Sequence, residues 1–277
     1  MDLKKFIVRA LVTLVFGPFI LFASWKGGYL FLALVASLVV LGINEFYNLA
    51  AQKATNPEKA IGMLSGLATC FVLFFYGVQH LWMVFAAAFV VLMVYELFRN
   101  LVGPILNVAT TVMGVMYVAF FFGFLILIRE FPAGRDGRFD YQDAGNLVMF
   151  IFIAIWVCDT AAYMLGSQVG RHKLFERVSP NKTVEGAVFG FLFALLTAYL
   201  CHATFLKDFE LVDLLVIGGI CGTLGQVSDL VESLFKRDAR VKDSANLIPG
   251  HGGVLDRFDS EMLVAPAVYF YLRFFVS

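Results

Sequence analysis

Long uninterrupted apolar runs are the feature that most constrains this fold, because about 20 apolar residues suffice for a helix to cross a bilayer. Such runs occupy most of the 277 residues, and the chain is 60% hydrophobic and only 15% charged. Soluble domains are about 45–50% apolar and about 25% charged. The runs are continuous rather than alternating, which favours helices over a barrel. The sequence therefore predicts an all-α, polytopic integral membrane protein.

The apolar runs predict about nine transmembrane helices. The first run follows Lys4 and Lys5 and lacks a clean signal-peptide cleavage site, so we interpret it as an uncleaved helix. We expect residues 1–277 to form one transmembrane domain. Its helices up to about residue 146 carry few motifs, and the catalytic helices and cytoplasmic loops are expected over about 147–265. The nine runs cover about 6–24, 28–50, 60–78, 81–98, 105–128, 147–170, 185–206, 211–235 and 260–276.

Loop charges predict the orientation of these helices. With nine spans the termini lie on opposite sides, and fifteen of the 21 Lys and Arg residues fall on the N-terminal side. The positive-inside rule then places the N-terminus and the loop 236–259 in the cytoplasm and the C-terminus opposite. We expect a bacterial inner-membrane location. The net charge of +0 gives no basic field for nucleic acid, and the four cysteines lie in apolar runs, which indicates buried thiols.

The last polar loop, 233–259, concentrates charge in an otherwise apolar chain. Pro249–Gly253, with His251 inside it, predicts a flexible turn that allows the backbone to approach a ligand closely. A loop that mixes cations and carboxylates suits a metal ion together with a polyphosphate. We therefore treat it as a candidate active site. Its charged residues are the cations Lys236, Arg237, Arg240, Lys242 and Arg257 and the acids Asp238, Asp243, Asp256 and Asp259.

Upstream of this loop, Asp229, Glu232, Ser233 and Lys236 stand at i, i+3, i+4 and i+7. If the eighth apolar helix continues this far, all four share one face. An ionised Asp inside a membrane helix usually faces a polar cavity or a partner. The alternative is a helix end at the interface, with Glu232 and Lys236 as a routine pair, but this leaves Asp229 without a reason.

A second polar loop contains Ser179 and Pro180, which we interpret as the N-cap and first residue of a helix. A helix N-terminus beside Lys182 suits a phosphate group, although a capped helix with a positive-inside lysine explains the motif equally well. Asp159, inside the sixth run, is a functional candidate or a structural hydrogen-bonding residue. Small residues on the eighth run predict close helix packing, and they are Gly218, Gly219, Gly222 and Gly225.

The charged loop resembles the signature of phosphatidate cytidylyltransferases, also called CDP-diacylglycerol synthases. The segments around Asp159 to Tyr163 and Ser179 to Gly186 are similar to that family as well, so the resemblance covers about 150–265. Its matching positions are Ser233-x-Phe235-Lys236-Arg237-x4-Lys242-Asp243-x-Ala245-x2-Ile248-Pro249-Gly250-His251-Gly252-Gly253-Val254-x-Asp256-Arg257-Phe258-Asp259.

The resemblance implies transfer of CMP from CTP to phosphatidate, which yields CDP-diacylglycerol and pyrophosphate. It also implies Mg²⁺, with one or two ions held by aspartates, and a homodimer in the bilayer. The metal ligands carried over are Asp229, Asp256 and Asp259. The catalytic residues are Asp229, Asp256, Lys236 and Lys242. The substrate-binding residues are Asp159, Ser179, Lys182, Arg237, His251, Gly252, Gly253 and Arg257.

Two other functions remain to be weighed. A CDP-alcohol phosphotransferase also uses aspartates at the membrane edge, and Asp256-x-x-Asp259 partly matches its motif, but the upstream D-G-x-x-A-R element is missing. A transporter needs paired broken helices near the bilayer midplane, whereas the charges here gather in cytoplasmic loops. Incorporation of label from CTP into lipid separates these functions.

Overall fold

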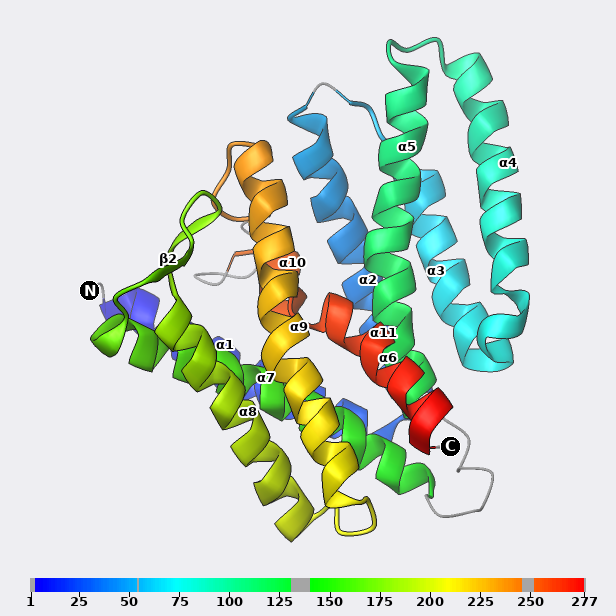
Figure 1. Cartoon of the computed structure of the whole chain (residues 1–277). Helices are drawn as coiled ribbons and strands as arrows, with labels where there is room; N and C mark the ends of the chain where they lie inside the picture. Colours follow the sequence, from blue (N-terminus) through cyan, green and yellow to red (C-terminus); the bar gives the residue numbers. More distant parts are fainter. Residues whose placement is uncertain (1–2, 54, 131–139, 246–251, 277) are drawn as a thin grey trace. The chain divides into compact units, whose positions relative to one another are not determined.

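The computed structural model describes residues 3–53, 55–130, 140–245 and 252–276, and side chains from Leu14 onward. These residues are almost entirely helical, with one two-stranded hairpin (Figure 1). Internal contacts divide the chain into two compact units, each built from three segments. The first unit comprises 1–20, 28–127 and 235–258, and the second comprises 21–27, 128–234 and 259–277.

The first unit is built around α2 (Gly28–Ala51), α3 (Lys59–Tyr76) and α4 (Leu81–Arg99), followed by a helical stretch that contains one π-helical segment. Small residues let α2 and α3 approach closely, because a Cβ atom on Gly66 would lie 2.6 Å from Ile43 Cδ1. The remaining elements that contribute to this unit are α1 (Leu3–Lys26), η1 (Gly77–His80), α5 (Pro104–Gly114), η2 (Val115–Phe120), α6 (Phe121–Arg129) and α10 (Leu255–Phe258).

The second unit is built around α7 (Tyr141–Val169) and α8 (Val184–Thr204), which pack along each other (Figure 1). Most of α9 (Leu211–Asp238) belongs to this unit, and its last turn, from residue 235, belongs to the first. The helix α11 (Glu261–Tyr271) and the π-helical segment η3 (Leu272–Val276) complete it.

Small residues bring the helices of the second unit together. A Cβ atom on Gly218 would lie 3.0 Å from Ala198 Cβ, and one on Gly222 would lie 3.0 Å from Phe191 Cα, so α9 packs tightly on α8. This confirms the prediction that the glycine stripe of the eighth run serves helix packing.

The connection between α7 and α8 corrects one prediction. Ser179 does not cap a helix, because it begins β2 (Ser179–Thr183), which pairs antiparallel with β1 (Lys173–Phe175). The helix α8 begins at Val184, and Thr183 is its N-cap, with its hydroxyl accepting a hydrogen bond from Gly186 N. The Ser-Pro pair is a local signal, and pairing with β1 outweighs it.

The structure confirms a predominantly helical membrane protein, in which the β1–β2 hairpin is a short exception. Within the described ranges, six helical stretches are long and apolar enough to cross a bilayer, and one of them, Lys59–Arg99, contains both α3 and α4. Each of the nine predicted runs corresponds to helix in the structure. The count of nine crossings and the assignment of 1–277 to a single domain stay predictions.

Candidate active site

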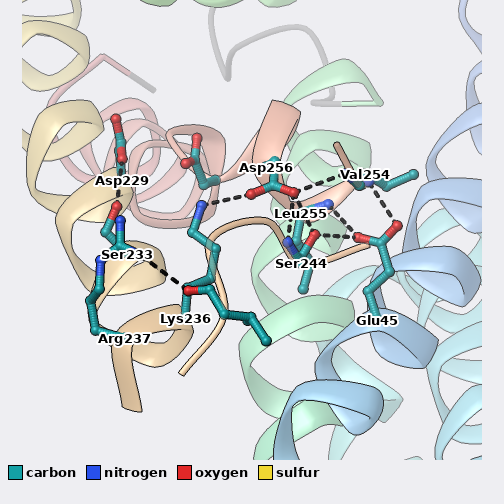
Figure 2. A network of polar contacts seen from close by, with 12 residues as sticks. Glu45, Asp229, Ser233, Lys236, Arg237, Ser244, Val254, Leu255 and Asp256 are labelled. Atoms are coloured by element: carbon teal, nitrogen blue, oxygen red, sulfur yellow. Dashed lines mark hydrogen bonds and ion pairs between the residues drawn. The ribbon is translucent and has the colours of Figure 1, made fainter. Parts of the chain in front are cut away.

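Asp256, on α10 of the first unit, accepts hydrogen bonds on both carboxylate oxygens (Figure 2). Lys236 Nζ donates to Oδ1 at 2.6 Å. Ser244 donates to Oδ2 from both its backbone nitrogen and its hydroxyl, each at 2.8 Å, and Gly253 N donates at the same distance. Burial alone would raise the pKa of Asp256, but Lys236 and these donors outweigh it and lower the pKa below its usual range.

Two glycines of the charged loop 233–259, called the signature loop from here on, make this arrangement possible. A Cβ atom on Gly253 would lie 2.2 Å from Ser244 Oγ and 2.4 Å from Glu45 Oε2. Gly252 has φ +83°, and its Cβ atom would lie 2.7 Å from Asp256 Oδ2. Position 253 therefore requires glycine for space. Position 252 requires glycine for space and for its positive φ.

Lys236 pairs with Asp256 inside the protein, since their side chains are only 10% and 5% exposed. The other predicted cations of this unit, Arg237, Lys242 and Arg257, are exposed. Arg237 donates a hydrogen bond to Val241 O at 3.1 Å, which holds its side chain over the end of α9. Of these four cations assigned to the site, one is therefore buried and three are solvent-accessible.

The second unit contains a separate group of carboxylates, which includes Asp229 and Asp259. Lys182, from β2, forms an ion pair with Asp229 Oδ2, and the Ser233 hydroxyl donates to Asp229 Oδ1 at 3.3 Å. The helix α9 continues to Asp238, which meets the condition under which Asp229, Glu232, Ser233 and Lys236 share one helix face. This ion pair thereby joins two residues that are 47 positions apart in the sequence.

Asp259 lies between α10 and α11 and is only 9% exposed. Its backbone carbonyl accepts a hydrogen bond from the Ser228 hydroxyl, which fixes the chain to α9. Burial raises the pKa of the Asp259 carboxyl well above its usual range, and negative charges on Asp229, Glu232, Asp159 and Glu261 raise it further. These five side chains form the acidic cluster of the second unit.

The acidic cluster fits Mg²⁺ by its chemistry, because this ion prefers carboxylate oxygens and lowers the electrostatic cost of crowding them. Across the described residues, no three His, Cys, Asp or Glu side chains are already arranged as metal ligands. Asp229 and Asp259 are the predicted ligands in this cluster. Asp256 is the third, and in the structure its oxygens are occupied by Lys236, Ser244 and Gly253.

Sequence reasoning selected most of these residues but missed three, which are Glu45, Ser244 and Glu261. Glu45 contacts the signature loop from α2, and Ser244 lies within that loop; both are buried. Glu45 could have been found as a lone acid in the apolar run 28–50. The predicted residues of the first unit are Lys236, Arg237, Lys242, Gly252, Gly253, Asp256 and Arg257, and those of the second are Asp159, Ser179, Lys182, Asp229 and Asp259. His251 lies outside the described residues.

The structure combines helices that are long and apolar enough to span a membrane with buried charged side chains near helix ends. Together with the family match that follows, these features define a membrane-embedded enzyme. The sequence model of the cytidylyltransferase family matches residues 7–275. The chain therefore belongs to the cytidylyltransferase family and is a nucleotidyltransferase. This confirms the resemblance found in the signature loop and removes the phosphotransferase and transporter alternatives.

Individual relatives agree with the family. Phosphatidate cytidylyltransferases of Staphylococcus epidermidis and Staphylococcus aureus are 32% and 33% identical to this chain, over 91% of it and 92% of their own length. The phosphatidate cytidylyltransferase of Bacillus subtilis is 37% identical over 163 residues, which are 59% of this chain and 57% of the relative.

Proposed function

We propose that this enzyme transfers CMP from CTP to phosphatidate and forms CDP-diacylglycerol and pyrophosphate for phospholipid synthesis. The observation that carries the proposal is the family match over residues 7–275. The names of the relatives supply the lipid substrate. An apolar, helical protein suits a substrate that is itself part of the bilayer.

The reaction requires no general base. A phosphate monoester has its second pKa near 6, so the phosphate group of phosphatidate is already a nucleophile at neutral pH. One of its oxygens forms a bond to the α-phosphorus of CTP. The bond from this phosphorus to the oxygen that bridges it to the β-phosphate breaks, and the electron pair leaves with pyrophosphate. The main barrier is repulsion between two anions, which positive side chains reduce.

The cations of the chain supply this stabilisation. Arg237, Lys242 and Arg257 are exposed, so the triphosphate can reach them. Lys236, held by Asp256, presents a fixed positive charge that needs no rearrangement when charge develops on the leaving group. We assign substrate binding to Lys182, Asp159 and Ser179 as well, on the resemblance stated above.

Asp229 and Asp259 would hold Mg²⁺, with Asp256 as the third assigned ligand and one or two ions in all. When bound, Mg²⁺ neutralises phosphate oxygens of CTP and of the leaving pyrophosphate. Asp229 also orients Lys182 through their ion pair, so a change at Asp229 affects both metal binding and a substrate cation.

We place the protein in a bacterial inner membrane, with the N-terminus and the 236–259 loop in the cytoplasm and the C-terminus opposite. The distribution of Lys and Arg in the loops supports this orientation, and CTP is available on that side. The homodimer rests on the resemblance alone, and cross-linking in membranes tests it.

Release of pyrophosphate from CTP by purified protein tests the function. We expect release to require both phosphatidate and Mg²⁺, and to fall at least about 10³-fold in Asp229→Asn, because a metal ion contributes several kcal/mol to such a reaction. Asp213→Asn is the matched control on the same helix, where Asp213 accepts a hydrogen bond from the Tyr271 hydroxyl at 2.7 Å. Release that does not depend on phosphatidate would refute the proposal.

A further inference from the structure

Glu45 is a buried acid in the otherwise apolar helix α2, nearly 200 residues before the signature loop. It is 2% exposed. A buried carboxylate is costly unless hydrogen-bond donors surround it, so the identity of its donors indicates why the chain retains it. Glu45 is not among the residues assigned to the metal ion or to the substrates.

The donors to Glu45 come from the signature loop of the same unit (Figure 2). Val254 N donates to Oε1 at 2.8 Å, and Leu255 N donates to Oε2 at 2.9 Å. The Ser244 hydroxyl also lies 2.9 Å from Oε2. The Glu45 carboxylate thus contacts the signature loop at two places: at Ser244, and at Val254 and Leu255 just before Asp256.

Ser244 connects Glu45 directly to Asp256. Its hydroxyl lies 2.9 Å from Glu45 Oε2 and 2.8 Å from Asp256 Oδ2. A hydroxyl has one proton and can donate to one of them at a time, but Ser244 N keeps its own bond to Asp256 throughout. The absence of a side chain at Gly253 leaves the space in which Glu45 reaches Ser244, and its absence at Gly252 leaves space for the Asp256 carboxylate.

We infer that Glu45 is a positioning residue for the proposed cytidylyl transfer: it fixes Ser244, Val254 and Leu255, and through them sets the position of Asp256 and its partner Lys236. This inference rests on the proposed function. Glu45 acts through these groups and does not touch the substrate. A misplacement of about 1 Å in a reacting constellation can cost about 10²-fold in rate, so fixing this loop has a measurable catalytic consequence.

Glu45→Gln tests the inference with little change in shape. One carboxylate oxygen becomes an NH₂ group, which faces a donor and cannot accept its hydrogen bond. We expect kcat to fall about 10–100-fold, as for other residues that orient a ligand group. The KM values for CTP and phosphatidate should stay within about threefold of wild type, because the substrates do not contact Glu45. Glu45→Asp, which keeps both oxygens, should recover part of kcat.

Glu96→Gln is the matched control in the same unit. Glu96 is also buried, and it accepts hydrogen bonds from Asn107 Nδ2 at 2.7 Å and Arg99 Nη1 at 3.3 Å, away from the signature loop. It should lower thermal stability and leave kcat per folded molecule within about twofold of wild type. An equal loss of kcat in the Glu45 and Glu96 variants would overturn the inference, as would an unchanged kcat in Glu45→Gln.

Amide hydrogen exchange provides a readout that does not depend on turnover. The amides of Val254 and Leu255 should exchange faster in Glu45→Gln, while amides in α7 and α8 keep their wild-type rates. Unchanged exchange at Val254 and Leu255 would overturn the inference. If wild-type protein shows no phosphatidate-dependent pyrophosphate release, the proposed function fails, and the exchange result alone then decides whether Glu45 holds the loop.

Discussion

The two units contain buried carboxylates in opposite electrostatic situations. In the first unit, Asp256 is surrounded by donors and paired with Lys236, so its pKa is lowered. In the second, burial and the other acids of the cluster raise the pKa of Asp259. The same residue type is thus neutralised by the protein in one place and crowded by like charge in the other.

The difference predicts how the free energy of each aspartate would respond to a bound cation. Lys236, Ser244 and Gly253 already donate to Asp256, so a metal ion at this third assigned ligand would share its oxygens with these donors. The acidic cluster around Asp259 lowers its free energy most when a positive ion enters. We therefore expect substitutions at the two positions to change stability in opposite directions, although both reduce activity.

Asp259→Asn should have the largest effect on activity, a loss of at least about 10³-fold, because it removes a proposed metal ligand. A carboxyl with a raised folded pKa stabilises the fold at low pH and loses that contribution as pH rises through the folded pKa. At pH 8 without metal, the variant should therefore unfold at a higher temperature than wild type. Thermal unfolding in detergent measures this.

Added Mg²⁺ sharpens the same comparison. Ligand at about 100 times its Kd stabilises the folded state by about 2.7 kcal/mol, so the wild-type unfolding temperature should rise with Mg²⁺. The rise should be smaller in Asp259→Asn. An equal rise in both proteins would contradict the assignment of Asp259 as a ligand.

Asp256→Asn should reduce stability, in contrast to Asp259→Asn. It leaves the buried Lys236 ammonium without its counter-charge, and breaking a buried pair costs about 3–5 kcal/mol. Because the folded pKa of Asp256 is lowered, its contribution is present at neutral pH and is lost as pH falls through that pKa. The stability gap between wild type and variant should therefore narrow in acid. A stability difference between wild type and variant that does not change with pH would contradict the lowered pKa of Asp256.

Lys53→Ala should have the smallest effect. Lys53 Nζ lies 2.9 Å from Asp238 Oδ1, but these side chains are 49% and 63% exposed. Exposed ion pairs contribute about 0–1 kcal/mol, so the variant should unfold close to wild type and retain activity. Comparison with Asp256→Asn within one unit then separates burial from charge pairing as the source of stability.

Much of the site could be predicted because its signals are local. The turn residues Gly252 and Gly253 and the charge of Lys236 are visible in a short stretch of sequence. The spacing of Lys236 from Asp229 predicts a shared helix face on the condition that the eighth helix continues past its apolar run. Ser179 shows where such signals fail, since its capping pattern is outweighed by strand pairing between Phe175 and Ser179. The conformation of this residue depends on a neighbour that the Ser-Pro pair does not specify.

Glu45 could not be placed from the sequence, because its donors are far away along the chain. A single acid hardly changes the mean hydropathy of a 24-residue helix such as α2. Nothing near position 45 indicates that backbone amides at 254 and 255 will bind it. Length and composition identify candidate spans, and helices such as α11, of 11 residues, fall below the length that a span needs.

The distance in sequence between Glu45 and its donors has a consequence for biosynthesis. Ser244 follows Glu45 by 199 residues and Leu255 by 210. At about 5–20 residues per second, the ribosome needs roughly 10–40 s to make this stretch. During that time the carboxylate of α2 lacks the amides that will solvate it. The nascent first unit must therefore keep this position hydrated until Ser244, Val254 and Leu255 have been synthesised and can donate to it.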